Sequence, residues 1–431
     1  MKKKSIGGKT LSPLPQTLSP IPLVGGGQIV QTPLRSWLWR LLLSLALLIA
    51  FPLQGKAGKG AEPILMGDER SDLYLPLLEG RRVAIFSNQT GCNSAGEHVL
   101  DLLLSQGIEV TTLFSPEHGF RGTADAGAHV SSSVDERTGI PILSLYDAGR
   151  NGPSDEAMQR FDVLVVDIQD VGLRFYTYYV SMLRLMTRCG ACDREVVIMD
   201  RPNPNGHYVD GPLLDMSLKS GVGALPIPIV HGMTLGELAL MAQGEGWVET
   251  PCRLTVVPCA GYTHHTFYRL PIAPSPNLPD MRSIYLYPST CFFEGTCVSL
   301  GRGTPWPFQM YGHPAMQSGR YVFTPVSRPG ATHPVLENQE CRGVSLRGLS
   351  MKRLQRMQRV DLSFVVDAYR RMGRPSDFFP RDGRFFDLLA GQRYVRQMIL
   401  EGASADEIRA RWQDDVQRFR EQRRPYLLYP E

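Results

Sequence analysis

The sequence predicts an α/β protein, in which a Rossmann-like parallel-sheet domain is followed by a smaller α+β C-terminal domain. Between residues 80 and 270, short runs rich in Val, Ile and Leu alternate with helical patterns. Such nearly continuous apolar runs are typical of strands buried on both faces. The strand, helix, strand order implies a parallel sheet with right-handed crossovers. After Leu270, closely spaced prolines end this alternation, so we place a domain junction there and a C-terminal domain over 271–431.

The expected elements follow in chain order. Strands are expected at 82–86, 108–114, 140–145, 161–168, 195–199 and 254–257, with helices at 95–105 and through 176–183. Thr234 and Glu237 have the spacing of a capping box that opens another helix. Beyond the junction, we expect a strand at 291–300 and helices at 362–372 and after Ser404. In that last helix, an apolar stripe at helical spacing predicts core packing, and it consists of Ile408, Trp412, Val416 and Phe419.

Composition limits the class of protein. The chain has 431 residues, of which 43% are hydrophobic and 20% charged, so it is long enough to bury a core and to form two domains. The net charge of +4 is small, and the basic residues are dispersed, which argues against a nucleic-acid partner. The densest basic cluster, Lys352, Arg353, Arg356 and Arg359, has spacing that suits a solvated helix face.

Residues 1–60 are interpreted as a leader outside the fold. Arg40 precedes an apolar run over 41–53, and Gly55 and Ala57 follow it, as in a secretory segment cleaved after Ala57. The run is shorter than the roughly 20 residues of a spanning helix, so we expect no stable membrane span beyond the leader. About forty residues precede it, which leaves two further readings: translation starts downstream of Met1, or the segment is retained as an anchor. Export predicts a periplasmic or extracellular protein.

The 8 cysteines show no zinc-ribbon spacing. An oxidising compartment would permit disulfides without requiring them. Cys189 and Cys192 have thioredoxin-like spacing, but they fall at the end of a helical pattern, whereas reactive pairs sit at helix starts. Local pairing or free thiols are therefore favoured over a redox site.

Polar residues follow three of the expected strands, and these ends share one edge of a parallel sheet. They are Glu117, His118 and Arg121 after the second strand, Asp167, Asp170, Arg174 and Tyr176 after the fourth, and Asn203 and Asn205 after the fifth. Carboxylates, amides, aromatic rings and arginines are the groups that a sugar site needs. The alternative is that the carboxylates cap helices or pair with local arginines such as Arg174 and Arg201.

Competing chemistries lack their motifs. Residues 88–91 read Asn-Gln-Thr-Gly where a dinucleotide-binding protein would carry its glycine fingerprint, and no Walker-type Gly-Lys-Thr follows a strand. The chain has no His-Glu-x-x-His element and no Gly-x-Ser-x-Gly elbow. We therefore predict no metal and disfavour a nucleotide-binding protein.

Several long blocks together resemble a known family. They are Ser-Pro-Glu-His-Gly-Phe-Arg-Gly at 115–122, Asp-Ile-Gln-Asp-Val-Gly-Leu-Arg-Phe-Tyr-Thr-Tyr at 167–178, Asp-Arg-Pro-Asn-Pro-Asn-Gly at 200–206, Pro-Ser-Pro-Asn-Leu-Pro at 274–279 and Tyr-Pro-Ser-Thr-Cys-Phe-Phe-Glu-Gly-Thr at 287–296. In this order they are similar to the signature blocks of the NamZ-type exo-β-N-acetylmuramidases, a glycoside hydrolase family formerly described as a domain of unknown function. Gly-Arg-Gly-Thr-Pro at 301–305 and Gly-Arg-Pro-Ser-Asp-Phe at 373–378 continue the resemblance.

The resemblance implies a catalytic cleft between the two domains. It implies removal of terminal β-1,4-linked N-acetylmuramic acid from the non-reducing end of peptidoglycan fragments, without an organic cofactor. It also implies that Glu117 is the favoured catalytic residue. A glycan-binding cell-wall protein without catalysis is the alternative, and the sequence does not predict the oligomeric state.

Residue chemistry suggests roles for the candidates. Glu117 would protonate the leaving oxygen, aided by His118 as a proton carrier and by Asp167 or Asp170 as a neighbouring carboxylate. The second catalytic group stays open, because an N-acetyl substrate can use its own acetamido oxygen. The candidates for gripping the lactyl carboxylate of muramic acid are Arg121, Arg174 and Arg302. Hydroxyl or acetamido groups would be held by Asn203, Asn205 and Asn277, with Tyr176 as an aromatic face. Glu294 is a reserve acid or, alternatively, a local capping or pairing residue.

Overall fold

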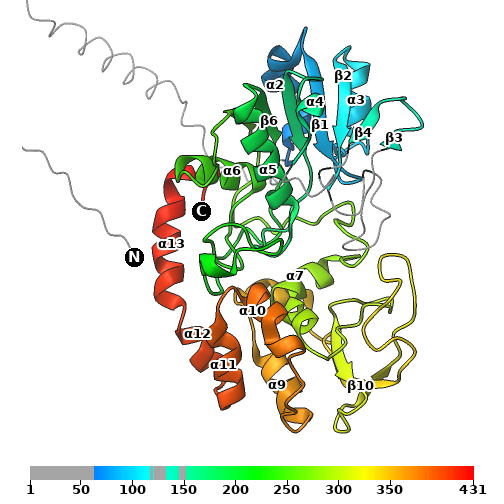
Figure 1. The fold of residues 1–431 in the computed structure, drawn as a ribbon, viewed down its shortest axis with the longest axis vertical. Coiled ribbons are helices and arrows are strands. Elements are labelled where there is room, and N and C mark those ends of the chain that lie inside the picture. Colours follow the sequence, from blue (N-terminus) through cyan, green and yellow to red (C-terminus); the bar gives the residue numbers. More distant parts are fainter. Residues whose placement is uncertain (1–62, 117–119, 121–132, 144, 146–151) are drawn as a thin grey trace, which may run out of the picture. The chain divides into compact units, whose positions relative to one another are not determined.

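A seven-stranded sheet organises the first part of the protein. The computed structural model describes residues 63–116, 120, 133–143, 145 and 152–431, and the leader lies outside these ranges. The strands are β1 (Arg82–Ser87), β2 (Glu109–Phe114), β3 (Ser133–Val134), β4 (Pro141–Leu143), β5 (Val163–Asp167), β6 (Glu195–Met199) and β7 (Arg253–Val257). Their order across the sheet is β3-β4-β2-β1-β5-β6-β7. Figure 1 shows β2, β4 and β3 on one side of β1 and β6 on the other.

The order in which strands join the sheet reverses at β1. All neighbouring strands are parallel except the edge pair β3 and β4. β1 pairs with β2 on one side and with β5 on the other. The chain therefore extends the sheet first toward one edge and later, from β5 on, toward the opposite edge. In α/β sheets, ligands bind at such a switch point, beyond the carboxyl ends of the strands. The loops after β1 and β5 therefore occupy the position where a site is expected.

Both faces of the sheet are buried, as the apolar runs predict. Val163 and Val165 share a core with α2 (Ser71–Leu78) and α3 (Val99–Ser105). Leu164 and Val166 point to the opposite face and share a core with α5 (Tyr178–Ala191) and α6 (Leu235–Gly244). Successive strand residues alternate between faces, so a continuous apolar strand needs helices on both sides.

The expected capping box is present at the start of α6. Thr234 Oγ1 accepts a hydrogen bond from Glu237 N at 3.2 Å, and Glu237 Oε2 accepts one from Thr234 N at 2.9 Å. The two side chains satisfy backbone donors that a helix start leaves unpaired. The sequence-based prediction of this boundary is confirmed.

A smaller antiparallel sheet lies in the second part of the chain, in the order β8-β10-β9. Its strands are β8 (Met310–His313), β9 (Tyr321–Phe323) and β10 (Cys341–Ser345). The other helices are α4 (Asp155–Met158), α7 (Met281–Thr290), α8 (Met351–Met357), α9 (Ser363–Arg371), α10 (Arg384–Ala390), α11 (Arg393–Glu401), α12 (Ala405–Ala410) and α13 (Gln413–Arg423). Short 3-10 turns occur at Gly67–Glu69, Met216–Leu218, Cys291–Gly295, Arg381–Gly383 and Arg424–Tyr426. The predicted fold class is confirmed.

Two element predictions were wrong. The strand expected at 291–300 is absent, because α7 runs to Thr290 and continues as the 3-10 turn η4 (Cys291–Gly295). This apolar run is buried, and a short buried helical segment and a buried strand have the same apolar pattern. The single helix expected after Ser404 is two helices, α12 and α13.

The apolar stripe of these last helices packs into the core, as predicted. Ile408, Trp412, Val416 and Phe419 are all at most 4% exposed. The buried carboxylate of Asp210 also accepts hydrogen bonds from Trp412 Nε1 at 2.9 Å and from Arg409 Nε at 3.0 Å. The end of the chain is thus fastened to a residue of the loop after β6.

Candidate active site

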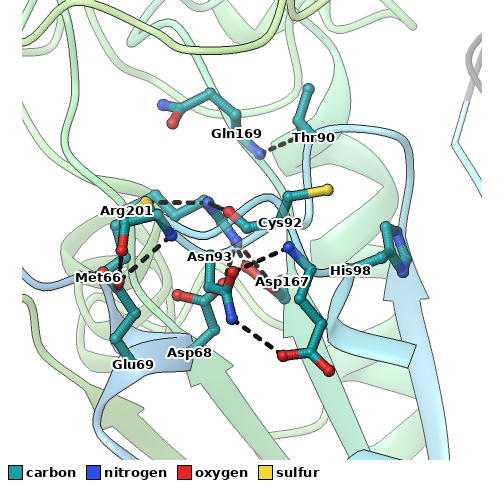
Figure 2. Close-up of polar contacts among 12 residues, drawn as sticks. Met66, Asp68, Glu69, Thr90, Cys92, Asn93, His98, Asp167, Gln169 and Arg201 are labelled. Carbon is teal, nitrogen blue, oxygen red and sulfur yellow. Dashed lines mark hydrogen bonds and ion pairs between the residues drawn. The ribbon is translucent and has the colours of Figure 1, made fainter. Parts of the chain in front are cut away.

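The loops after β1 and β5 are joined directly at the switch point. Ser87 Oγ donates to Asp167 O at 2.6 Å, across the last residues of the two strands. Thr90 Oγ1 accepts a hydrogen bond from Gln169 N at 3.0 Å, and Asn88 Oδ1 accepts one from Thr90 Oγ1 at 2.6 Å. Figure 2 shows the contact between Thr90 and Gln169 above the strand ends. The two loops therefore form one connected platform.

Asp167 lies beneath this platform in a buried ion-pair cluster. Arg201 donates from Nε to Asp167 Oδ1 at 2.5 Å and from Nη2 to Asp167 Oδ2 at 2.9 Å. Arg201 Nη2 also contacts Asp68 Oδ2 at 2.7 Å (Figure 2). Burial and the negative charge of Asp167, which binds the same guanidinium, raise the pKa of Asp68. Asp167 is thereby held in the alternative role considered for it, a local pair with an arginine.

Asp170 has a different environment. Its Oδ1 accepts a hydrogen bond from Gly172 N at 2.6 Å, while its Oδ2 is buried and has no hydrogen-bond partner among the described residues. The side chain is 7% exposed, and burial raises the pKa of Asp170 to about 7. A carboxyl group with this pKa is a proton donor or acceptor near neutral pH. Of the two aspartates expected at the end of β5, Asp170 is the one whose pKa burial raises toward neutral pH, and neither of them lines the cavity beside this segment.

A cavity of about 190 Å³ lies beside the residues that follow β5. Its wall combines aromatic rings, an amide and an ion pair, and includes Tyr176, Tyr178, Asn277, Tyr287, Glu294, Arg302 and Phe308. Four of these, Tyr176, Asn277, Glu294 and Arg302, are sequence-predicted site residues, and they come from both parts of the chain. The structure therefore brings together residues that are more than a hundred positions apart.

The two tyrosines of the cavity are held by one carbonyl group. Tyr176 Oη and Tyr178 Oη donate to Pro274 O at 2.8 and 2.9 Å. Asn88 Nδ2 donates to Tyr178 Oη at 3.0 Å, which links this pair to the loop after β1. The aromatic faces are thus fixed before any ligand binds, which reduces the entropy lost on binding.

Arg302 and Glu294 form the charged part of the wall. Arg302 donates to Glu294 Oε1 from Nη2 at 2.6 Å and from Nε at 3.2 Å. The two side chains are 25% and 22% exposed, and the guanidinium lies 5.4 Å from the centre of the Phe308 ring. The pair is thus partly accessible to a ligand, while the Phe308 ring packs against the guanidinium.

Asn277 holds the wall together and faces the cavity. Its Nδ2 donates to Gly330 O at 2.7 Å, and its backbone N donates to Ser275 Oγ at 3.2 Å. Because Nδ2 is hydrogen-bonded, the orientation of the side-chain amide is fixed, and with it the position of Oδ1. This geometry suits an acceptor for a hydroxyl or acetamido N–H group.

Three other expected ligand-binding residues are used inside the fold. Arg174 is fully buried, and its terminal nitrogens donate to the carbonyl oxygens of Pro212, Ile227, Leu389 and Ala390. Asn203 Nδ2 donates to Met233 O, and Asn203 Oδ1 accepts from Asn205 N, both at 2.8 Å. Asn205 Nδ2 donates to Val171 O at 2.9 Å. The structure places these three side chains in loop packing and does not bring them to the cavity.

Glu117, His118 and Arg121 lie outside the described residues. Phe120, from the same segment, is described and is 3% exposed. Its ring packs edge-on against His98, with 5.2 Å between the ring centres. His98 Nε2 is 2.8 Å from Asn88 O, in the residue that contacts Tyr178.

Several residues of the site were missed by sequence reasoning. Tyr287 and Phe308 line the cavity, and Asp68 completes the cluster around Arg201. Tyr287 opens one of the signature blocks, so its place in that block was an available indication. Asp68 and Phe308 stand in segments with no motif, and only the fold brings them to the site.

Other site types find no support in the described part of the chain. No group of three or more His, Cys, Asp or Glu side chains there has the arrangement of a metal site. The described cysteines are free thiols, and burial raises the pKa of Cys189 far above its usual value, the opposite of a reactive thiol. Among the described helices, none has the length and apolar character needed to cross a bilayer.

Comparison with known proteins gives consistent results over both parts of the chain. Residues 83–282 match the family model for the N-terminal domain of exo-β-N-acetylmuramidase NamZ, and residues 285–429 match the model for its C-terminal domain. The peptidoglycan β-N-acetylmuramidase NamZ of Bacillus subtilis (strain 168) is 35% identical over 378 residues, which cover 83% of this chain and 89% of the relative.

Two solved structures share the fold. A DUF1343 family protein from Bacteroides fragilis NCTC 9343 is 55% identical with a TM-score of 0.79, covering 86% of this chain and 100% of that protein. A second DUF1343 family protein from the same organism is 28% identical with a TM-score of 0.71, covering 85% of this chain and 99% of that protein.

Proposed function

The chain belongs to the exo-β-N-acetylmuramidase NamZ family, and we propose that it removes terminal, non-reducing β-1,4-linked N-acetylmuramic acid from peptidoglycan fragments. The observation that carries this assignment is the match to a peptidoglycan β-N-acetylmuramidase over 83% of the chain. The two family models match in sequence order, and the residues that line the first cavity lie within the matched ranges. No finding favours the non-catalytic glycan-binding alternative.

The cavity has the chemistry of a single-sugar site. Tyr176 and Tyr287 offer apolar ring faces to a pyranose, and Asn277 offers a hydrogen-bond acceptor to its acetamido group. Muramic acid differs from glucosamine by a lactyl carboxylate, and a guanidinium is the side chain best suited to bind a carboxylate. Arg302 is the described arginine of this wall, and we assign it the recognition of the lactyl group.

The catalytic roles rest on separate grounds. The family resemblance makes Glu117 the favoured catalytic residue, and residue chemistry suggests that it acts as general acid with His118 as a proton carrier. Asp170 is kept as a candidate for the second carboxyl group, since burial raises its pKa to about 7, but its buried side chain does not line the first cavity. Arg121 remains a second candidate for the lactyl carboxylate.

The proposed substrate requires the protein to be exported. Peptidoglycan lies outside the cytoplasm, and the apolar run over 41–53 followed by Ala57 has the pattern of a secretory signal. We assign the protein to the periplasm or the cell exterior, with the two domains meeting near residue 270. Sequencing the N-terminus of the mature protein tests export: a start after Ala57 supports it, and a start at Met1 contradicts it.

A pair of chromogenic substrates tests the activity. The purified protein is incubated with a β-N-acetylmuramide and with the matching β-N-acetylglucosaminide, which lacks the lactyl group. Hydrolysis of the muramide with little hydrolysis of the glucosaminide is expected. Binding of the muramide without turnover would support the non-catalytic alternative, and equal turnover of both would contradict muramic acid specificity.

A further inference from the structure

A second, larger cavity of about 550 Å³ adjoins the first. Its wall includes Phe267, Arg269, Pro274, Leu278, Arg282 and Gln355. Leu278 lines both cavities, and Pro274, which lines the second, holds Tyr176 and Tyr178 of the first through its carbonyl oxygen. The segment from Pro274 to Leu278 therefore separates two neighbouring spaces.

This dividing segment is held on several sides. Gln89 Nε2 donates to Ala273 O at 3.1 Å, which ties the segment to the loop after β1. Leu278 N donates to Ser275 O at 2.9 Å, and Asn277 Nδ2 donates to Gly330 O at 2.7 Å. The segment between the two cavities is therefore held in place, and a ligand that extends from the first cavity to the second would cross it.

The second cavity is rich in positive charge. Arg269 and Arg282 line it, and Arg282 also donates to the carbonyl oxygen of Leu349. α8 places Gln355 on the cavity wall, whereas Lys352 and Arg356 line a separate pocket on the same helix. In the part of the chain that the structure describes, Arg269 and Arg282 form no ion pair.

One acidic residue, Asp280, also lines this cavity. Its Oδ1 accepts a hydrogen bond from Ser283 N at 2.8 Å, and both of its carboxylate oxygens are 3.0 Å from Gln309 Nε2. These contacts direct the carboxylate to the start of α7. The wall therefore carries two guanidinium groups against one carboxylate, and this net positive charge attracts an anion.

An aromatic ring stands at the same cavity. Phe267 is 46% exposed, and its ring packs against His207 with 4.8 Å between the ring centres. The ring is thus held by an edge-to-face contact with His207 while part of it remains exposed to solvent. Exposed, supported aromatic faces bind sugar rings, whereas a purely ionic partner would not need one.

We propose that this second cavity binds the glycan strand beyond the scissile bond, with Arg269 and Arg282 contacting the lactyl carboxylate of the next muramic acid. The inference rests on the proposed function. In a peptide-free peptidoglycan strand, every second sugar carries such a free carboxylate, so the strand is a regularly spaced polyanion. The preferred substrate is then a strand of at least three sugars, and the disaccharide is the lesser substrate.

The test compares a disaccharide, MurNAc-GlcNAc, with its peptide-free tetrasaccharide repeat. Values of kcat/KM are measured for the wild type, for the double variant Arg269→Gln/Arg282→Gln, and for the control Arg320→Gln, an exposed arginine outside this cavity. The wild type and the control should prefer the tetrasaccharide by roughly tenfold, since two exposed charge contacts each contribute up to about 1 kcal/mol. The double variant should lose this preference, and 0.5 M salt should reduce it in the wild type, because exposed ion pairs are screened.

A tetrasaccharide preference that survives in the double variant overturns the inference. Equal losses on both substrates also overturn it, since they place the arginines at the first sugar. If the wild type hydrolyses neither substrate, the proposed function fails, and calorimetric binding then decides the inference separately. Tenfold tighter binding of the tetrasaccharide by the wild type than by the double variant supports it. Equally tight binding of the uncharged tetramer of N-acetylglucosamine removes the role of the carboxylate.

Discussion

Arg302 donates two hydrogen bonds to a single oxygen of Glu294, from Nη2 at 2.6 Å and from Nε at 3.2 Å. Among the described residues, Arg302 Nη1 and Glu294 Oε2 have no further hydrogen-bond partner. The carboxylate thus orients the guanidinium without using all of its donors. A ligand carboxylate can bind to the remaining donor at the wall of the first cavity.

Arg302→Gln should lower kcat/KM for a chromogenic muramide by about 10- to 100-fold, because a charge-assisted hydrogen bond contributes roughly 1.5–3 kcal/mol. The matching glucosaminide has no carboxylate, so its turnover should change much less. Arg320→Gln removes an exposed arginine outside this cavity and serves as the matched control, with thermal unfolding confirming that both variants fold. Equal losses on the two substrates would show that Arg302 does not recognise the lactyl group.

Glu117→Gln should reduce turnover of the muramide by at least a hundredfold, since the amide keeps the shape of the side chain and cannot donate the proton. The measurement is kcat on substrates with good and poor leaving groups. The loss should be largest for the poor leaving group, which depends most on protonation. Near-normal activity would remove Glu117 from its proposed role.

Asp170 predicts a pH-dependent difference in stability. Its pKa in the folded protein, about 7, lies above the ordinary value of 3.8, so folding favours the protonated form. Relative to Asp170→Asn, the wild type should have its full stability below about pH 4 and lose stability as the pH rises through 7. The difference in unfolding temperature between the two proteins, measured from pH 4 to 8, isolates this carboxyl group. A difference independent of pH would mean that Asp170 titrates normally.

Arg201→Met should reduce the free energy of unfolding by about 3–5 kcal/mol, because it leaves Asp68 and Asp167 buried without their shared cation. Arg253→Met is the matched control. That arginine is 59% exposed and pairs with Glu195, so its loss should cost less than about 1 kcal/mol. Denaturant unfolding measures both values, and similar small losses would contradict a structural role for the Arg201 cluster.

The sequence was most informative where one physical cause determined the pattern. Continuous apolar runs predicted the buried parallel strands, and the box of Thr234 and Glu237 predicted the start of α6. The prediction of a strand at 291–300 was wrong, although it used the same criterion, an apolar run, that correctly identified the other strands. Burial on all sides produces an apolar run whether the backbone is extended or helical.

The site could be predicted only in part, because residue type does not determine where a side chain points. Asp167 and Asp170 stand three positions apart, yet one pairs with Arg201 and the other has an unpartnered oxygen. Arg174 is as basic as Arg302, but its donors satisfy four backbone carbonyls in the core. Such differences depend on long-range contacts, such as the carbonyl groups of Leu389 and Ala390, which no local pattern records.

The most direct test of the central claim follows the products released from a peptide-free glycan strand with N-acetylmuramic acid at its non-reducing end. Mass spectrometry of a time course should show free N-acetylmuramic acid as the first product, together with a strand shortened by one sugar that begins with N-acetylglucosamine. Release of internal disaccharides or longer fragments, or an unchanged strand, would contradict an exo-acting muramidase.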